Sequence, residues 1–90
     1  MLNYLVISAL GEDRPGIVDR LSKVVLDGGC NIEDSRMTVL GGEFAVLLLI
    51  TGQWNNIAKV ENSLERVGAD LGLTVTAKRT EGRRSRRDQM

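Results

Sequence analysis

The most constraining feature of the chain is an unbroken apolar run over residues 44–50, Phe-Ala-Val-Leu-Leu-Leu-Ile. Gly41 and Gly42 precede this run, and Thr51-Gly52 follows it. A short apolar run between turn residues is typical of a strand that is buried on both faces. Paired glycines favour a two-residue hairpin turn, because glycine tolerates the positive φ angles that such a turn needs. The run therefore predicts a central strand that a hairpin joins to the preceding strand.

The remaining pattern predicts three more strands and two helices. Apolar residues fill both alternating sets of residues 2–10, so this strand is also expected to be covered on both faces. Residues 30–40 begin with polar and charged side chains, which suits the edge of a sheet, and residues 73–77 alternate as a last strand. Apolar side chains at helical spacing predict helices over residues 15–27 and 54–69, each with one apolar face.

The predicted order of elements is βαββαβ, which indicates the α+β class. Right-handed crossovers in this order give a ferredoxin-like fold, a four-stranded antiparallel sheet with both helices on one face. The two helices can cover only that face, yet two strands are apolar on both faces. The second face is covered by a second copy, a second domain or another partner, or it stays exposed. We favour association, because burial of apolar surface stabilises by roughly 25 cal/mol per Å².

Residues 11–18, Gly-Glu-Asp-Arg-Pro-Gly-Ile-Val, link the first strand to the first helix and form the candidate binding segment. Pro15 suits the first helical turn because it fixes φ and needs no amide partner, and Asp13 is the natural cap before it. The glycines leave backbone amides accessible at the helix start, where anionic groups bind. The alternative is a well-formed turn that binds nothing.

Asn31, at the start of the second strand, offers an amide donor and an acceptor to a ligand. The alternative is that it only caps the turn before it. In this fold, Asn31 and Asp13 are expected at opposite ends of the first helix. Two copies packed side by side would bring them onto one ligand. A bound amino acid would then place its carboxylate at the helix-start amides and its ammonium group near Asp13.

Composition argues against several functional classes. The 90 residues include no histidine and one cysteine, Cys30, which disfavours zinc chemistry and suits a reducing compartment. No serine has a histidine partner for nucleophilic catalysis. RNA recognition needs aromatic side chains on the central strands to stack bases, whereas the third strand offers aliphatic residues with Phe44 at its edge. No apolar run approaches the ~20 residues that span a bilayer, and the start lacks the basic region of a signal peptide. We therefore expect a cytoplasmic protein that is not an enzyme, has no cofactor or metal, and contacts no membrane.

The charges divide the chain into two parts. Residues 1–77 hold ten acidic and six basic side chains, whereas residues 78–90 hold six basic and two acidic ones. We expect one domain over residues 1–79 and a basic, disordered tail over residues 80–90. The tail is interpreted as a solvated end or a linker, with a nucleic-acid contact as the alternative. The acidic body argues against direct nucleic-acid binding, and its Phe44 and Trp54 are expected in the core.

Residues 11–18 resemble the ACT domain family, as do residues 29–36, Gly-Cys-Asn-Ile-Glu-Asp-Ser-Arg, together with Gly42-Glu-Phe44 and Thr51-Gly52. ACT domains are ferredoxin-like amino-acid sensors that pair into dimers and bind their ligand at the interface. The segment over residues 29–36 is the more specific one. It resembles the first ACT domain of the glycine cleavage system transcriptional repressors, and the similarity extends over about residues 1–80.

The resemblance implies a regulatory domain that works as a homodimer, senses a small amino acid such as glycine and acts through protein contacts. It further implies restraint of a LysR-type transcriptional activator without direct contact to nucleic acid. Members of that family carry two ACT domains in tandem, so this chain departs from their pattern. The alternatives are the regulatory ACT domain of a formyltetrahydrofolate deformylase-like enzyme and an interaction adaptor without a ligand. By resemblance, the residues that match common ligand contacts are Glu12, Asp13, Arg14, Pro15, Gly16, Ile17, Val18, Asn31 and Ile32.

Overall fold

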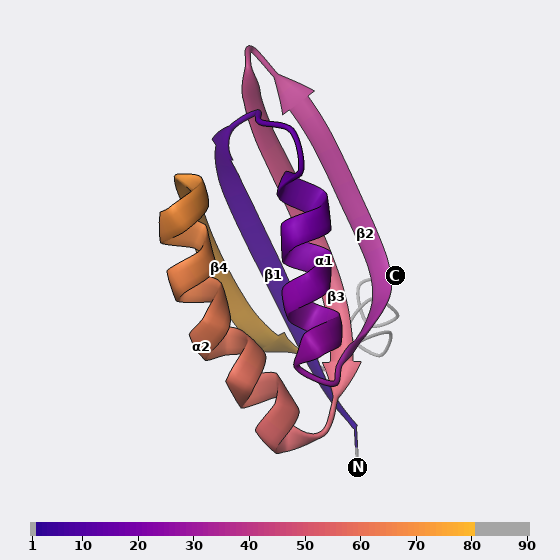
Figure 1. Ribbon diagram of the computed structural model, residues 1–90. Helices are drawn as coiled ribbons and strands as arrows, with labels where there is room; N and C mark the ends of the chain where they lie inside the picture. Colours follow the sequence, from indigo (N-terminus) through magenta and orange to yellow (C-terminus); the bar gives the residue numbers. More distant parts are fainter. Residues whose placement is uncertain (1, 81–90) are drawn as a thin grey trace, which may run out of the picture.

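A computed structural model describes residues 2–80 of the chain. Its four strands form one antiparallel sheet in the order β2-β3-β1-β4, and the element order is βαββαβ (Figure 1). The predicted ferredoxin-like α+β fold is confirmed, with the charged strand at an edge of the sheet as expected. The predicted tail lies outside the described residues, apart from Thr80. The elements are β1 (Asn3–Glu12), α1 (Ile17–Asp27), β2 (Asn31–Leu40), β3 (Glu43–Gly52), α2 (Trp54–Leu71) and β4 (Leu73–Thr80).

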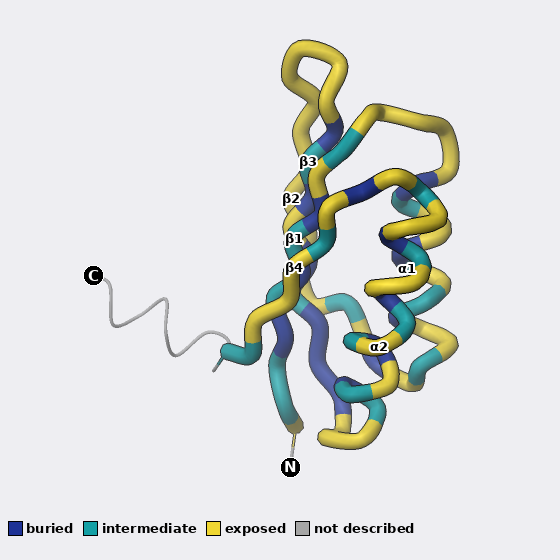
Figure 2. The backbone as a smooth tube through the Cα atoms, turned by 90° about the vertical axis from the view of Figure 1, so that its left-hand side faces the viewer, coloured by how far each residue is buried: buried dark blue, intermediate teal, exposed yellow. Residues whose placement is uncertain are grey.

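The molecule has two layers, because both helices lie on the same side of the sheet (Figure 2). Each helix presents one apolar stripe to the sheet, as its periodicity predicts. The core between the layers takes every second residue of β1 and β3, and no helix of the described residues lies on the other side of the sheet. The largest fully buried side chains are Leu5, Ile7, Ile17, Leu21, Val25, Ile50, Ile57, Val60 and Leu64.

The hairpin between β2 and β3 has the predicted geometry. Gly41 and Gly42 have φ angles of 57° and 84°, and positive φ at both central residues is the primed turn that matches the twist of the strands. The β2–β3 register shifts between Ile32 and Asp34, where Glu33 forms a bulge. Because of this bulge, Ile32 lies on the helix side with Ile50, whereas Asp34 lies on the open side with Leu49.

The start of α1 differs from the prediction. The helix begins at Ile17 rather than Pro15, and its N-cap is Gly16, with a φ of 82° and, within the described chain, no side-chain cap. Asp13 is therefore not the cap. Its backbone amide instead donates to the carbonyl of Gly42 at 3.2 Å. This bond holds the chain against the β2–β3 hairpin, so the reversal into α1 occurs later, at a residue that tolerates positive φ.

The end of β4 and one aromatic residue also differ from the predictions. β4 continues to Thr80 because Lys78 and Arg79 pair with β1, so these two basic residues belong to the sheet. Phe44 is buried as expected. Trp54 is not buried, since this residue is 61% exposed. The guanidinium of Arg79 lies 4.0 Å from the centre of the Trp54 ring, so this ring covers a cation rather than entering the core.

Candidate functional site

A small pocket of about 160 Å³ lies at the turn between β1 and α1. Five of the residues predicted from the sequence border this pocket, all of them within the stretch from Asp13 to Val18. Asp19 and Phe44 also border it and were not predicted. Asp19 could have been found from its position three residues after Gly16, whereas Phe44 comes from β3, opposite Gly11, through the sheet register. The complete lining is Asp13, Arg14, Gly16, Ile17, Val18, Asp19 and Phe44.

The backbone at Gly16 leaves this pocket open. A Cβ built on Gly16 would meet no atom within 4 Å. The first intrahelical hydrogen bond runs from the amide of Arg20 to the carbonyl of Gly16. The amides of Ile17, Val18 and Asp19 precede it and have no intrahelical acceptor. Together with the positive end of the helix dipole, these amides can bind a carboxylate.

The charged side chains of the turn complement those amides. Arg14 forms an ion pair with Glu12 at 3.2 Å, and both side chains are exposed, so the pair is screened by solvent and contributes little to stability. Asp13 and Asp19 are exposed acidic residues on the pocket. The pocket thus offers amide donors for a carboxylate and carboxylates for an ammonium group, the two charged groups of a free amino acid.

The other predicted site residues lie elsewhere. Pro15 is exposed in the turn and does not line the pocket. Asn31 opposes Thr51, which in turn opposes Tyr4, at the far end of β1 from Asp13. From Tyr4 to the last residue of β1 the strand spans about 26 Å at roughly 3.3 Å per residue. One copy of the chain therefore does not bring Asn31 and Asp13 together.

Asn31 itself is exposed, and Ile32 is half-buried against the core. The neighbour of Asn31 across the strands, Thr51, is 3% exposed. Within the described residues, its Oγ1 is buried without a hydrogen-bond partner. The start of β2 therefore has an exposed amide side chain beside an unsatisfied hydroxyl.

Residues 2–80 contain neither a cluster of metal-ligating side chains nor a membrane-spanning helix. No group of three His, Cys, Asp or Glu residues in this range could hold a metal ion. None of the helices in the same range has the length and apolar character needed to cross a bilayer.

Cys30 is buried beside Gly52, where burial raises the pKa of the thiol and keeps it protonated.

Known proteins match this chain over nearly its whole length. The family model of the ACT domain matches residues 3–78. The glycine cleavage system transcriptional repressor of Escherichia coli is 51% identical over 81 residues, which are 90% of this chain and 43% of the repressor. A UPF0237 protein of Methanocaldococcus jannaschii is 34% identical over 76 residues, 82% of this chain and 84% of that protein.

Solved structures give the same grouping. A crystal structure assigned to the glycine cleavage system transcriptional repressors superposes with a TM-score of 0.88 at 43% identity, covering 90% of this chain and 47% of that one. A formyltetrahydrofolate deformylase from Pseudomonas putida has a TM-score of 0.74 at 13% identity, a likeness of fold alone. The chain spans a little under half the length of the repressors it matches. The family match includes both parts of the candidate site, residues 11–18 and Asn31 with Ile32.

Proposed function

The chain belongs to the ACT domain family, and from this premise we propose that it is a regulatory domain that binds a small amino acid as a homodimer. The observation that carries the proposal is the pocket at the start of α1. Its uncapped amides suit the carboxylate of an amino acid, and Asp13 suits the ammonium group. A volume of about 160 Å³ is below that of a pocket for a drug-sized ligand, which favours a small ligand such as glycine.

Two copies can complete this site through their β2 edges. β2 is an edge strand, and an edge strand presents unpaired backbone groups to a second strand. An antiparallel β2–β2 contact sets the first residue of β2 in one copy beside the last residue of β2 in the other. That last residue, Leu40, leads into the hairpin whose Gly42 holds the amide of Asp13. The contact therefore carries Asn31 of the partner subunit toward the Asp13 turn.

The similarity to the glycine cleavage system transcriptional repressor of Escherichia coli supports a regulatory role, and we propose the finer parts together with it. These are glycine as the ligand, a LysR-type transcriptional activator as the protein partner, and a cytoplasmic role without catalysis or direct contact to nucleic acid. The proposed organisation is an ACT domain over residues 1–79 followed by a basic tail over residues 80–90. The repressor is about twice as long as the part that this chain matches, so these roles are tested on the chain directly.

The direct test measures the melting temperature with each of the twenty amino acids at millimolar concentration. At ten times its Kd, a ligand of the folded state adds about 1.4 kcal/mol, and each kcal/mol raises the melting temperature of a domain this small by roughly 4–8 °C. We expect a saturable rise with glycine that Asp13→Asn and Asn31→Ala each abolish. Asp27→Asn, an exposed acid at the other end of α1, is the matched control. The proposal is wrong if no amino acid shifts the melting temperature.

A further inference from the structure

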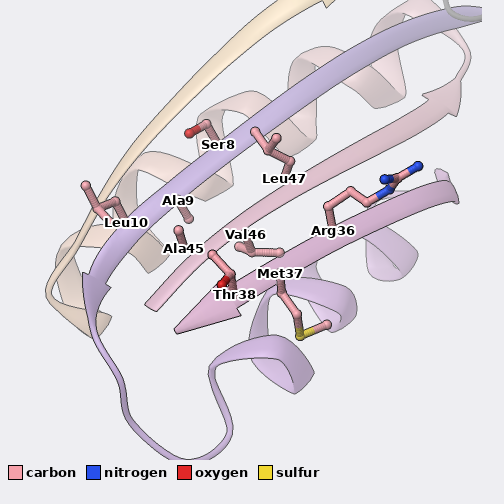
Figure 3. Close-up of a pocket in the computed structure, with 9 residues that line it drawn as sticks. All are labelled: Ser8, Ala9, Leu10, Arg36, Met37, Thr38, Ala45, Val46 and Leu47. Carbon is pink, nitrogen blue, oxygen red and sulfur yellow. The ribbon is translucent and has the colours of Figure 1, made fainter. Parts of the chain in front are cut away.

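The face of the sheet that lacks helices is apolar in its centre. The helix-side residues of β1 and β3 are buried, but their neighbours in sequence project to the open side, where Leu10 is 51% and Leu47 49% exposed. A groove of about 310 Å³ runs over this face between β1, β3 and β2, and Figure 3 shows Leu10 of β1, Leu47 of β3 and Arg36 of β2 among the side chains that line it. The six central side chains of the face are Val6, Ser8, Leu10, Ala45, Leu47 and Leu49.

We propose that this face binds a second copy of the chain, face to face, about a two-fold axis that runs parallel to the strands between the two sheets. Such an axis places β3 of one copy over β1 of the other, and β2 over β4. It leaves positions along the strands unchanged, so each row of residues across the sheet meets the same row of the other copy. The register of the sheet then fixes which side chains face each other.

The central rows are complementary in size under this axis. Ser8 and Leu47 are partners in one row, and Leu10 and Ala45 are partners in the next row on the same face. Face-to-face packing sets Leu47 over Ser8 of the partner subunit, and Leu10 over Ala45 of the partner subunit. Large side chains opposite small ones interdigitate, as the inner layers of packed sheets do.

One row at the rim of the face pairs opposite charges, and its Asp34 also lies 3.9 Å from Arg36 of its own strand in an exposed ion pair. Asp34 and Lys78 lie at opposite ends of one row, because Asp34 pairs with Leu49, Leu49 with Val6, and Val6 with Lys78. Face-to-face packing sets Asp34 over Lys78 of the partner subunit, and the two-fold axis repeats this pair. A lysine side chain can span most of the ~10 Å between packed sheets. Arg79 points to the helix side, where it contacts Glu61, which leaves Lys78 on the open side.

The area is sufficient for a specific dimer. Four strands spaced about 4.8 Å apart, with about nine residues each at roughly 3.3 Å, present a face on the order of 570 Å². A pair would bury about 1,100 Å², at the low end of specific protein interfaces. An apolar centre between charged and hydroxyl-bearing edges also matches the anatomy of such interfaces. We therefore expect a dimer that dissociates at low concentration.

This contact is independent of the amino-acid site proposed above. It leaves the Asp13 turn and both β2 edges uncovered, so a β2–β2 contact can form in addition. The axes of the two contacts do not meet, and copies that use both form an open assembly rather than a closed ring. The β2–β2 contact completes the amino-acid site, whereas the face-to-face contact does not touch it. Measuring association with and without glycine therefore separates the two contacts.

The test is sedimentation equilibrium of the full chain without amino acids. We expect a concentration-dependent dimer whose Kd rises at least tenfold in Asp34→Lys and in Lys78→Asp. The double variant Asp34→Lys with Lys78→Asp should return the Kd to within about threefold of the original. Within one copy these residues lie three strands apart, about 14 Å, so the recovery can occur only between copies.

The matched controls are Asp27→Lys and Lys23→Asp, which reverse exposed charges on α1, far from the open face, and should leave the Kd unchanged. Leu47→Asp should abolish the face-to-face dimer, and circular dichroism checks that each variant is folded. The inference is overturned if the chain is monomeric at all concentrations, or if the double variant associates no better than the single ones. Loss of the dimer with retained glycine binding would confirm that the two surfaces are separate.

Discussion

Two glycines of the segment over residues 11–18, Gly11 in β1 and Gly16 in the turn before α1, have different physical roles. Gly16 has a φ of 82° and open space where a Cβ would stand, so its role is purely one of backbone conformation. At Gly11, a Cβ would lie 2.7 Å from Cδ2 of Leu73 and 2.8 Å from the carbonyl oxygen of Gly72, so its role is close packing of β1 on β4. Glycine is therefore needed at position 16 for its positive φ and at position 11 for the close contact between β1 and β4.

Gly16→Ala should cost about 1–2 kcal/mol of stability, because an alanine must adopt the left-handed conformation without gaining any contact. Gly16→Asn should cost clearly less, since asparagine tolerates this region better than other residues that have a Cβ. Urea denaturation of the three proteins measures this as a shift in midpoint with an unchanged m-value. Equal midpoints for alanine and glycine would contradict the positive φ at this position.

Burial raises the pKa of the Cys30 thiol, which links stability to pH. The unfolded chain releases this proton near the ordinary pKa of 9.0, while the folded chain retains it to higher pH. The contribution is therefore fully present below pH 9 and is lost as the pH rises through the folded pKa. We expect the free energy of unfolding to fall more steeply from about pH 8 to 10 in the original chain than in Cys30→Ala. Parallel slopes for the two proteins would show that the thiol is not shielded.

At the scale of elements, the sequence predicts best where one local pattern decides. The apolar run forms β3, the two glycines form the hairpin and the helices have one apolar face each, as predicted. Burial of β3 on both faces is not seen within one copy, where Leu47 is 49% exposed. The start of α1 was misplaced because Asp13 and Pro15 satisfy a local capping pattern, whereas the amide of Asp13 bonds to Gly42, which is distant in sequence. β4 was predicted too short because its last basic residues look like a tail until β1 supplies their partners.

The candidate site follows the same rule. The residues from Asp13 to Val18 could be predicted together because they are contiguous in one motif. Phe44 could not, since only the β1–β3 register brings it to the turn. Trp54 was expected in the core because tryptophan is large and apolar. Trp54 is instead the first residue of α2, and its contact with Arg79 depends on how β4 ends.

Arg79 fastens the end of β4 to α2. Its guanidinium donates to Glu61 at 2.9 Å and stacks on Trp54, and both members of the ion pair are about two-thirds buried. We expect Arg79→Ala to cost about 1 kcal/mol. A double-mutant cycle with Trp54→Leu should give a coupling of about 0.5–1 kcal/mol. The control is Arg66→Ala, which removes an exposed arginine from α2 and should leave the free energy of unfolding nearly unchanged. Additive effects of the Arg79 and Trp54 changes would contradict the stacking.

At the scale of the whole molecule, two surfaces have no partner among residues 2–80 of the same copy. One is the edge of β2, next to the Asp13 turn at one end and Asn31 at the other. The second is the open face of the sheet, whose residues belong to both central strands. The sequence alone does not distinguish these two surfaces, because both suggest association. The structure separates them, since contact through the open face leaves Asn31 and Asp13 at opposite ends of the sheet.

A site shared between copies makes a prediction that no site within one copy makes. Asp13→Asn and Asn31→Ala should each abolish glycine binding in their own dimers. In a mixed dimer, the intact Asp13 turn of one variant meets the intact Asn31 of the other, so one of the two sites is whole. Random exchange in an equal mixture should therefore restore about a quarter of the sites, which isothermal titration calorimetry detects as the fraction of chains that bind. A mixture of Asp13→Asn with Asp13→Ala is the control, because every site in its mixed dimers has an altered Asp13 and none should recover. Absence of recovery in the first mixture, with both variants still dimeric, would place the whole site within one copy and remove the reason for pairing through β2.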